Sequence, residues 1–80
     1  MHVEMFVLRP GAKNLELMAR VRPNGVGKMQ VEEVTPLMDG TMNVLEMIRD
    51  KHPNEDRKFL ETIVGNYARS TRLQAKLIEG

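Results

Sequence analysis

Four prolines divide the chain into short segments, and this spacing limits what each segment can fold into. They stand at positions 10, 23, 36 and 53. Proline fixes φ and lacks a backbone N–H, so neither a long helix nor a central strand passes through it undisturbed. Pro10-Gly11 and Pro23-Asn24-Gly25 are turn signals, and Pro53 disfavours helical geometry at His52. Beyond Pro53 there is no further proline, so one long element is allowed there.

The first part of the chain predicts strands. Residues 2–9 are rich in β-branched and aromatic types, with apolar side chains on both faces, which indicates a central strand or one covered by a partner. Residues 15–22 alternate, and residues 28–33 predict a third, shorter strand. The alternation places Leu15, Leu17, Ala19 and Val21 opposite Glu16, Met18, Arg20 and Arg22. A two-stranded hairpin followed by a longer irregular segment is the alternative.

The second part predicts two helices. Thr35-Pro36 is typical of a helix start, and apolar residues at three- and four-residue spacing continue to Ile48, so a first helix is expected over 35–52. Because Gly40 weakens the first turn, a regular helix that begins nearer Asp39 or Thr41 is the alternative. Asn54 is a suitable cap for a second helix over 54–79, whose apolar residues recur at about 100° per residue. The expected fold class is α+β: a three-stranded antiparallel β-meander in a strand-rich 1–34 segment, followed by two α-helices packed on one face, within a single domain 1–80.

The length of the second expected helix predicts a partner. A helix of the 24 residues from Glu55 to Ile78 would extend about 36 Å, whereas a compact chain of 80 residues is about 30 Å across. Its end should therefore overhang and be buried by a second copy of the chain or by another protein. The alternative is a helix that frays after Ser70 and leaves a flexible tail. The candidate interface comprises apolar side chains at that end, on the first two strands and on the first helix: Leu73, Leu77, Ile78, Phe6, Leu8, Met18 and Met47.

Charge is unevenly distributed along the chain. Residues 1–30 carry five basic and two acidic side chains, residues 31–56 carry two and seven, and residues 57–80 carry five and two. Such alternation suits self-association or docking on a charged partner, although a solvated surface produces it equally well. A candidate basic patch on the second helix and second strand comprises Lys58, Arg69, Arg72, Lys76, Arg20 and Arg22. It makes nucleic-acid binding the alternative function, against which the net charge of +1 and the three aromatic residues both weigh.

No group of residues predicts catalysis or metal binding. The chain has no Cys, and its two His residues are far apart in sequence. Ser70 is the only Ser and has no His near it. The Gly25-Val26-Gly27-Lys28 segment leads into a predicted strand, whereas a phosphate-binding loop is longer and leads into a helix. We expect no catalytic residue, metal or cofactor, while an enzyme site formed between subunits remains a third possibility.

The same features predict where the chain resides and what it does. No apolar run approaches the roughly 18 residues that span a bilayer, and the first eight residues are too mixed for a signal peptide. A cytoplasmic location without membrane contact is expected. The predicted function is that of a small non-enzymatic protein-interaction module, homo-oligomeric, that serves as a regulator, inhibitor or assembly subunit.

Overall fold

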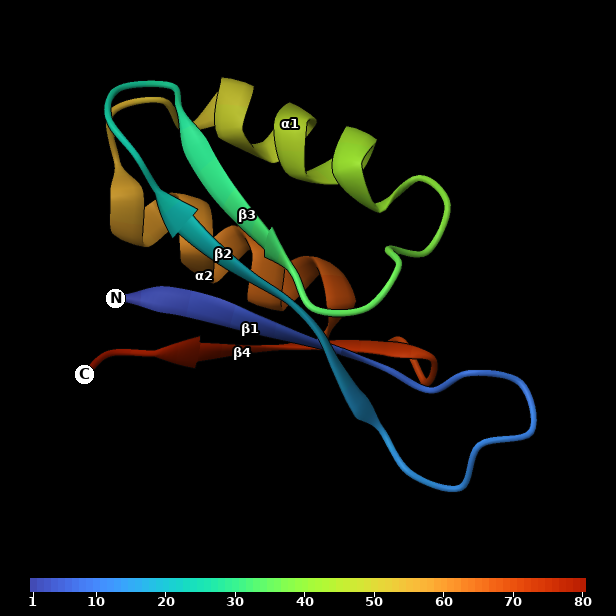
Figure 1. Cartoon of the computed structure of the whole chain (residues 1–80). Helices are drawn as coiled ribbons and strands as arrows, with labels where there is room; N and C mark the ends of the chain where they lie inside the picture. Colours follow the sequence, from blue (N-terminus) through green and yellow to red (C-terminus); the bar gives the residue numbers. More distant parts are fainter.

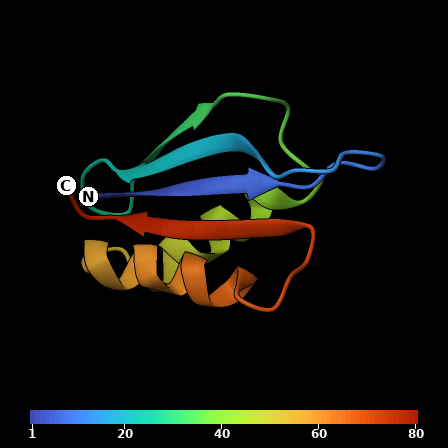
Figure 2. The same ribbon diagram turned by 90° about the horizontal axis from the view of Figure 1, so that it is seen from below.

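The computed structural model describes residues 1–80 and has an α+β fold, as predicted. In chain order its elements are β1 (His2–Val7), β2 (Glu16–Pro23), β3 (Met29–Glu33), α1 (Thr41–Lys51), α2 (Asp56–Tyr67) and β4 (Leu73–Ile78). The four strands form one antiparallel sheet in the order β3-β2-β1-β4. Both helices lie on the same side of this sheet, and the two termini lie at the same end of the molecule (Figures 1 and 2).

The last strand corrects the sequence-based prediction. The second helix does not extend over 54–79 but ends at Tyr67. The predicted three-stranded meander β1-β2-β3 is present, but the sheet has a fourth strand, because Leu73–Ile78 returns along β1 as β4. The Ser70 hydroxyl accepts hydrogen bonds from the N–H groups of Arg72 and Leu73, at 3.3 and 3.1 Å. This local turn competes with helical hydrogen bonding and ends the helical region. The predicted overhanging helix therefore does not exist.

Both helices also begin later than the predicted ranges 35–52 and 54–79, and the first begins at the alternative start, Thr41. The first begins at Thr41 rather than at residue 35, because Gly40 occupies the N-cap position with φ of 82°, a left-handed conformation that glycine adopts without strain. Residues 34–40 form an irregular connection. The second helix begins at Asp56, with Glu55 rather than Asn54 at the N-cap. Neither N-cap residue makes a side-chain capping bond.

A bulge in β2 changes which side chains face the helices. Met5 pairs with Ala19 while Phe6 pairs with Leu17, so Met18 is an extra residue in β2. Met18 and Ala19 are both fully buried. The alternation predicted for residues 15–22 is therefore correct after Met18 and wrong before it. Leu17 joins Phe6 on the face of the sheet away from the helices.

The core lies between the sheet and the two helices. Its apolar cluster contains residues of β1, β2, β4 and both helices: Val3, Met5, Val7, Met18, Val21, Leu45, Ile48, Phe59, Leu60, Ile63 and Leu73. Only 14 of the 80 residues are buried, as the large surface of a short chain leads one to expect. None of the helices combines the length and apolar character needed to cross a membrane.

Arg9 and Arg49 hold loops in place through hydrogen bonds. Arg49 of α1 is 1 % exposed, and its guanidinium donates to the backbone oxygens of Lys28 and Gly25, at 2.8 and 2.7 Å. The β2–β3 turn is thereby fixed to the helices, and Gly27 adds a backbone bond to Pro53 at 2.9 Å. Arg9 connects the β1–β2 loop to the irregular segment before α1 through Thr35 Oγ1, at 3.1 Å, and the Pro36 carbonyl.

Candidate interaction face of the sheet

One face of the sheet has no helix or strand packed against it (Figures 1 and 2). Because Val3, Met5 and Val7 point toward the helices, the alternate residues of β1 point away from them. Strand pairing extends this assignment to the other strands. We call this surface the open face, and it comprises His2, Glu4, Phe6, Leu17, Arg20, Arg22, Gln30, Glu32, Gln74, Lys76 and Ile78.

A row of ion pairs crosses the open face. Arg20 Nε lies 3.3 Å from Glu4 Oε2, and Arg20 Nη1 lies 3.2 Å from Glu32 Oε2. Arg22 Nη1 lies 3.3 Å from Glu32 Oε1. Lys76 stands opposite Glu4 on β4 but forms no ion pair. Within this row, two carboxylates balance two guanidinium groups, so the middle of the open face is close to neutral.

An apolar cluster lies beside the charged row. Phe6 and Leu17 are cross-strand partners, and Leu15, just before β2, is 41 % exposed. A hollow of about 330 Å³ separates this cluster from β4 and is lined by Phe6, Leu15, Gln74, Ala75 and Lys76. Solvent-facing sides of antiparallel sheets are normally polar, so an apolar cluster at this position is unusual.

The predicted interface residues lie on several different surfaces of the structure or in its core. Leu73 is 5 % exposed and belongs to the core, while Leu77 packs half-buried on the same side of β4. Met18, which was predicted to be exposed, is fully buried because the bulge turns it inward. Met47 is 52 % exposed on α1, away from the open face.

The remaining predicted interface residues lie on or beside the open face. Phe6 and Ile78 belong to it, and Leu8 follows directly after β1, where it is half-buried. No single surface therefore contains the whole predicted interface. Phe6 is the member beside which Leu15 and Leu17 lie.

The predicted basic patch is not a continuous stripe. Lys58 is on α2, whereas Arg69 and Arg72 lie in the α2–β4 connection and Lys76 is on β4. Arg20 and Arg22 are engaged by carboxylates. The helical face on which nucleic-acid binding was predicted is therefore not formed.

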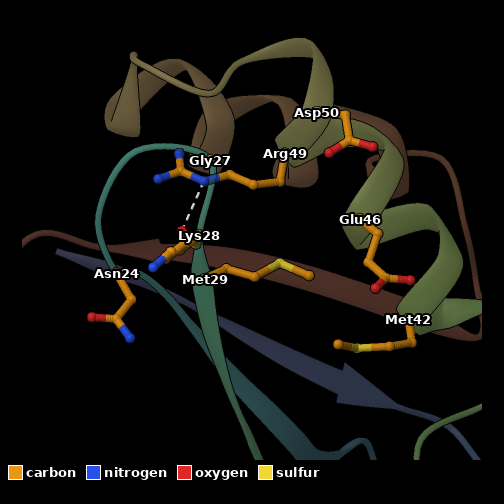
Figure 3. A pocket seen from close by; sticks show the side chains of 8 residues that line it. All are labelled: Asn24, Gly27, Lys28, Met29, Met42, Glu46, Arg49 and Asp50. Carbon is orange, nitrogen blue, oxygen red and sulfur yellow. Dashed lines mark hydrogen bonds between the residues drawn. The ribbon is translucent and has the colours of Figure 1, made fainter.

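The largest hollow in the molecule lies between the β2–β3 turn and α1, and Figure 3 shows its lining. It measures about 600 Å³ and is lined by Asn24, Gly27, Lys28, Met29, Met42, Glu46, Arg49 and Asp50. Arg49 also donates to the His52 carbonyl and to Asp56 Oδ1, at 3.2 and 3.1 Å, and its guanidinium stacks 4.7 Å from the ring centre of Phe59. Most of its donors are thus satisfied within the protein, and it acts as a structural tie rather than as a ligand-binding group.

Sequence reasoning missed the two arginines that organise the loops and the leucines that complete the apolar cluster. Arg49 sits within the helical pattern as one charged residue among several, and its partners are backbone carbonyls of a distant turn. No sequence signal identifies such partners. No family model matches the chain, and the comparisons found no similar curated protein and no similar solved structure.

Proposed function

We propose that this chain is a small, non-enzymatic interaction module that self-associates through the open face of its sheet. The observation that carries the proposal is an apolar cluster of exposed Leu15 with half-buried Phe6 and Leu17, on a face that no other element covers (Figure 2). Removing apolar surface from water contributes about 25 cal/mol per Å². A second copy that covers this cluster would gain that contribution without any change in the fold.

The charges of the open face favour a second copy over a strongly charged partner. The ion pairs of Arg20 with Glu4 and Glu32 already neutralise the centre of the face. Two copies of a nearly neutral face can approach without strong like-charge repulsion. A nucleic acid or a highly acidic protein would instead have to compete with these internal carboxylates for the two arginines.

The size of the interface sets a further requirement. A standard dimer buries about 800 Å² on each partner, which is more than three apolar side chains supply. The charged row and the exposed residues of β4 must therefore join the contact around the apolar cluster. With few buried residues of its own, the chain belongs to the size range in which oligomerisation commonly adds stability.

A module of this kind acts by binding to the surfaces of other protein chains. It serves as a regulator, an inhibitor or an assembly subunit, and its activity depends on which surfaces remain free in the oligomer. The helix side would remain free in a dimer formed through the open face. Met47, exposed on α1, lies on that free side and is available for a further protein partner.

The test is the molar mass in solution, measured by light scattering over the micromolar concentration range. The subunit mass is 9.2 kDa, and the wild-type chain is expected to approach twice that value as its concentration rises. Phe6→Lys should shift the mass toward that of the monomer, because it buries a charge in the contact. Circular dichroism checks that the variant remains folded.

Met47→Lys is the matched control, since it replaces an exposed apolar residue on the opposite side of the molecule. Its mass should follow that of the wild type. A wild-type mass of 9.2 kDa at every concentration would contradict the proposal. So would a dimer that Met47→Lys dissociates and Phe6→Lys leaves intact.

A further inference from the structure

The hollow of about 600 Å³ between α1 and the β2–β3 turn lies on the helix side of the sheet (Figure 3). α1 packs mainly against α2 and makes few contacts with β3, which leaves this space open to solvent. The hollow is separate from the open face, because Met29 and Val31 of β3 pack toward the core, whereas Gln30 and Glu32 point away from it. Whatever binds here therefore leaves the open face free.

Helical spacing determines which side of α1 lines the hollow. Met42, Glu46, Arg49 and Asp50 line it, and they stand at positions i, i+4, i+7 and i+8 of one helical face. Met47 is exposed on the same helix but does not line the hollow. Since Arg49 is buried and bonded to the β2–β3 turn, α1 presents one methionine and two carboxylates to an occupant.

The carboxylates of Glu46 and Asp50 are not neutralised by the chain itself. Both residues are exposed, and neither takes part in an ion pair. Lys28 lines the opposite side of the hollow, on the turn (Figure 3). Two like charges four residues apart on a helix repel each other, so a cation placed between them is favoured. The helix wall of the hollow is therefore suited to a positively charged group.

Two methionines form the apolar part of the lining. Figure 3 shows the side chains of Met29 and Met42 extending toward one another across the space between β3 and α1. Met42 is 40 % exposed, and Met29 is half-buried. Thioether side chains are flexible and polarisable, and they adapt to the apolar side chains of a partner. An occupant that fits both parts of the hollow combines a positive charge with an apolar group.

We propose that this hollow binds a short basic segment of another protein, in which lysine or arginine residues stand next to large apolar side chains. A cationic group of the segment lies against Glu46 and Asp50, and an apolar side chain lies on Met29 and Met42. A nucleic acid or an acidic segment would meet the two carboxylates and be repelled. Arg49 fixes the turn to α1 before any partner arrives, so binding requires little ordering of the chain.

The test is a titration of the full-length, ¹⁵N-labelled chain with a short synthetic peptide of leucine and lysine, followed by amide chemical shifts. Saturable shifts are expected at Met29, Met42, Glu46 and Asp50, and added salt should weaken binding because it screens exposed charges. A peptide with glutamate in place of every lysine keeps the leucines and should produce no saturable shifts. Equal binding of the two peptides, or saturable shifts confined to the open face, would overturn the proposal.

Variants locate the peptide. Glu46→Gln and Asp50→Asn should each weaken binding about threefold, as expected for the loss of one exposed ion pair, and Met42→Ser should weaken it by a similar factor because an apolar contact is lost. Substitutions at such exposed positions leave the fold intact. Glu61→Gln and Met47→Ser are the matched controls, since both residues are exposed and lie outside the hollow. Equal losses for Glu46→Gln and Glu61→Gln would indicate general charge attraction and overturn the site.

Discussion

Arg49 is the single residue on which the arrangement of several loops depends. Its guanidinium connects α1 to the β2–β3 turn, to the end of α1 at His52 and to the start of α2 at Asp56. A fully buried arginine is tolerated only because these acceptors replace the water it has lost. Asp56, by contrast, is well exposed, so solvent screens its ion pair with Arg49. The carbonyl bonds therefore carry more of the stabilisation than the salt bridge.

Replacement of Arg49 by Met tests this role. The apolar part of the side chain is retained, but the turn carbonyls lose their shared donor, so Arg49→Met should lower the free energy of unfolding by about 2–4 kcal/mol. Chemical denaturation of the two proteins measures the difference. Arg69→Ala, at an exposed arginine, should change it by less than about 0.5 kcal/mol. An equally small effect for Arg49→Met would contradict the structural role.

Tyr67 offers a second test at the residue scale. Burial raises its pKa above the usual 10.0, so the folded chain holds the phenol proton to a higher pH than the unfolded chain does. Stability from the neutral phenol should be fully present below about pH 10 and should decrease as the pH rises through the folded-state pKa.

The absorbance of the phenolate measures this pKa directly, because the chain has one Tyr and no Trp. The midpoint should lie above 10.0 in the folded chain and return to 10.0 in denaturant. A folded-state midpoint at or below 10.0 would show that Tyr67 is solvated.

At the scale of elements, β4 shows most clearly where sequence reasoning failed. Leu73 and Leu77 are four residues apart, and a spacing of four places two residues on one face of a helix and on one face of a strand alike. The intervening Gln74 and Lys76 alternate with Leu73, Ala75 and Leu77, which is a strand pattern. The helical interpretation extended the pattern of α2 through Ser70 and overlooked this change of period.

The elements that were predicted correctly have strong local signals. Turn residues at Pro10-Gly11 and Pro23-Asn24-Gly25 separate β1, β2 and β3. The ends of these strands lie within a few residues of the predicted ends. The bulge at Met18 and the pairing of β1 with β4 depend on contacts between distant residues, which periodicity does not encode. The same limit applies to the candidate site: Phe6 was identified from the two-sided pattern of β1, whereas the contribution of Leu17 follows only from the bulge.

Hydrogen exchange distinguishes the strand from the predicted helix. Leu8 N–H bonds to the Arg72 carbonyl at 2.7 Å, and the antiparallel register continues this pattern along β4. The amides of Gln74 and Lys76 should therefore bond to β1 and exchange slowly, while those of Ala75 and Leu77 face away from β1 at the sheet edge and exchange fast. Uniform protection of residues 73–78 would indicate a helix and contradict the sheet topology.

At the scale of the whole molecule, the open face of the sheet is the feature that calls for a partner. Helices cover one face (Figure 2), and the other carries a neutralised charged row beside the apolar cluster of half-buried Phe6 and Leu17 and exposed Leu15. The sheet edges discourage growth by strand addition, since β3 carries Glu32 and Glu33 and β4 carries Lys76. Under the proposed self-association, contact through the face would form a closed pair rather than an extended assembly.

The most direct test is an isotope-filtered NOE experiment on an equimolar mixture of labelled and unlabelled chains. It detects only contacts between different copies. Contacts of the Phe6 ring with the methyl groups of Leu15 and Leu17 are the expected result. Contacts confined to the helix side, such as those of Met47, or a spectrum without contacts between copies at millimolar concentration, would contradict self-association through the open face.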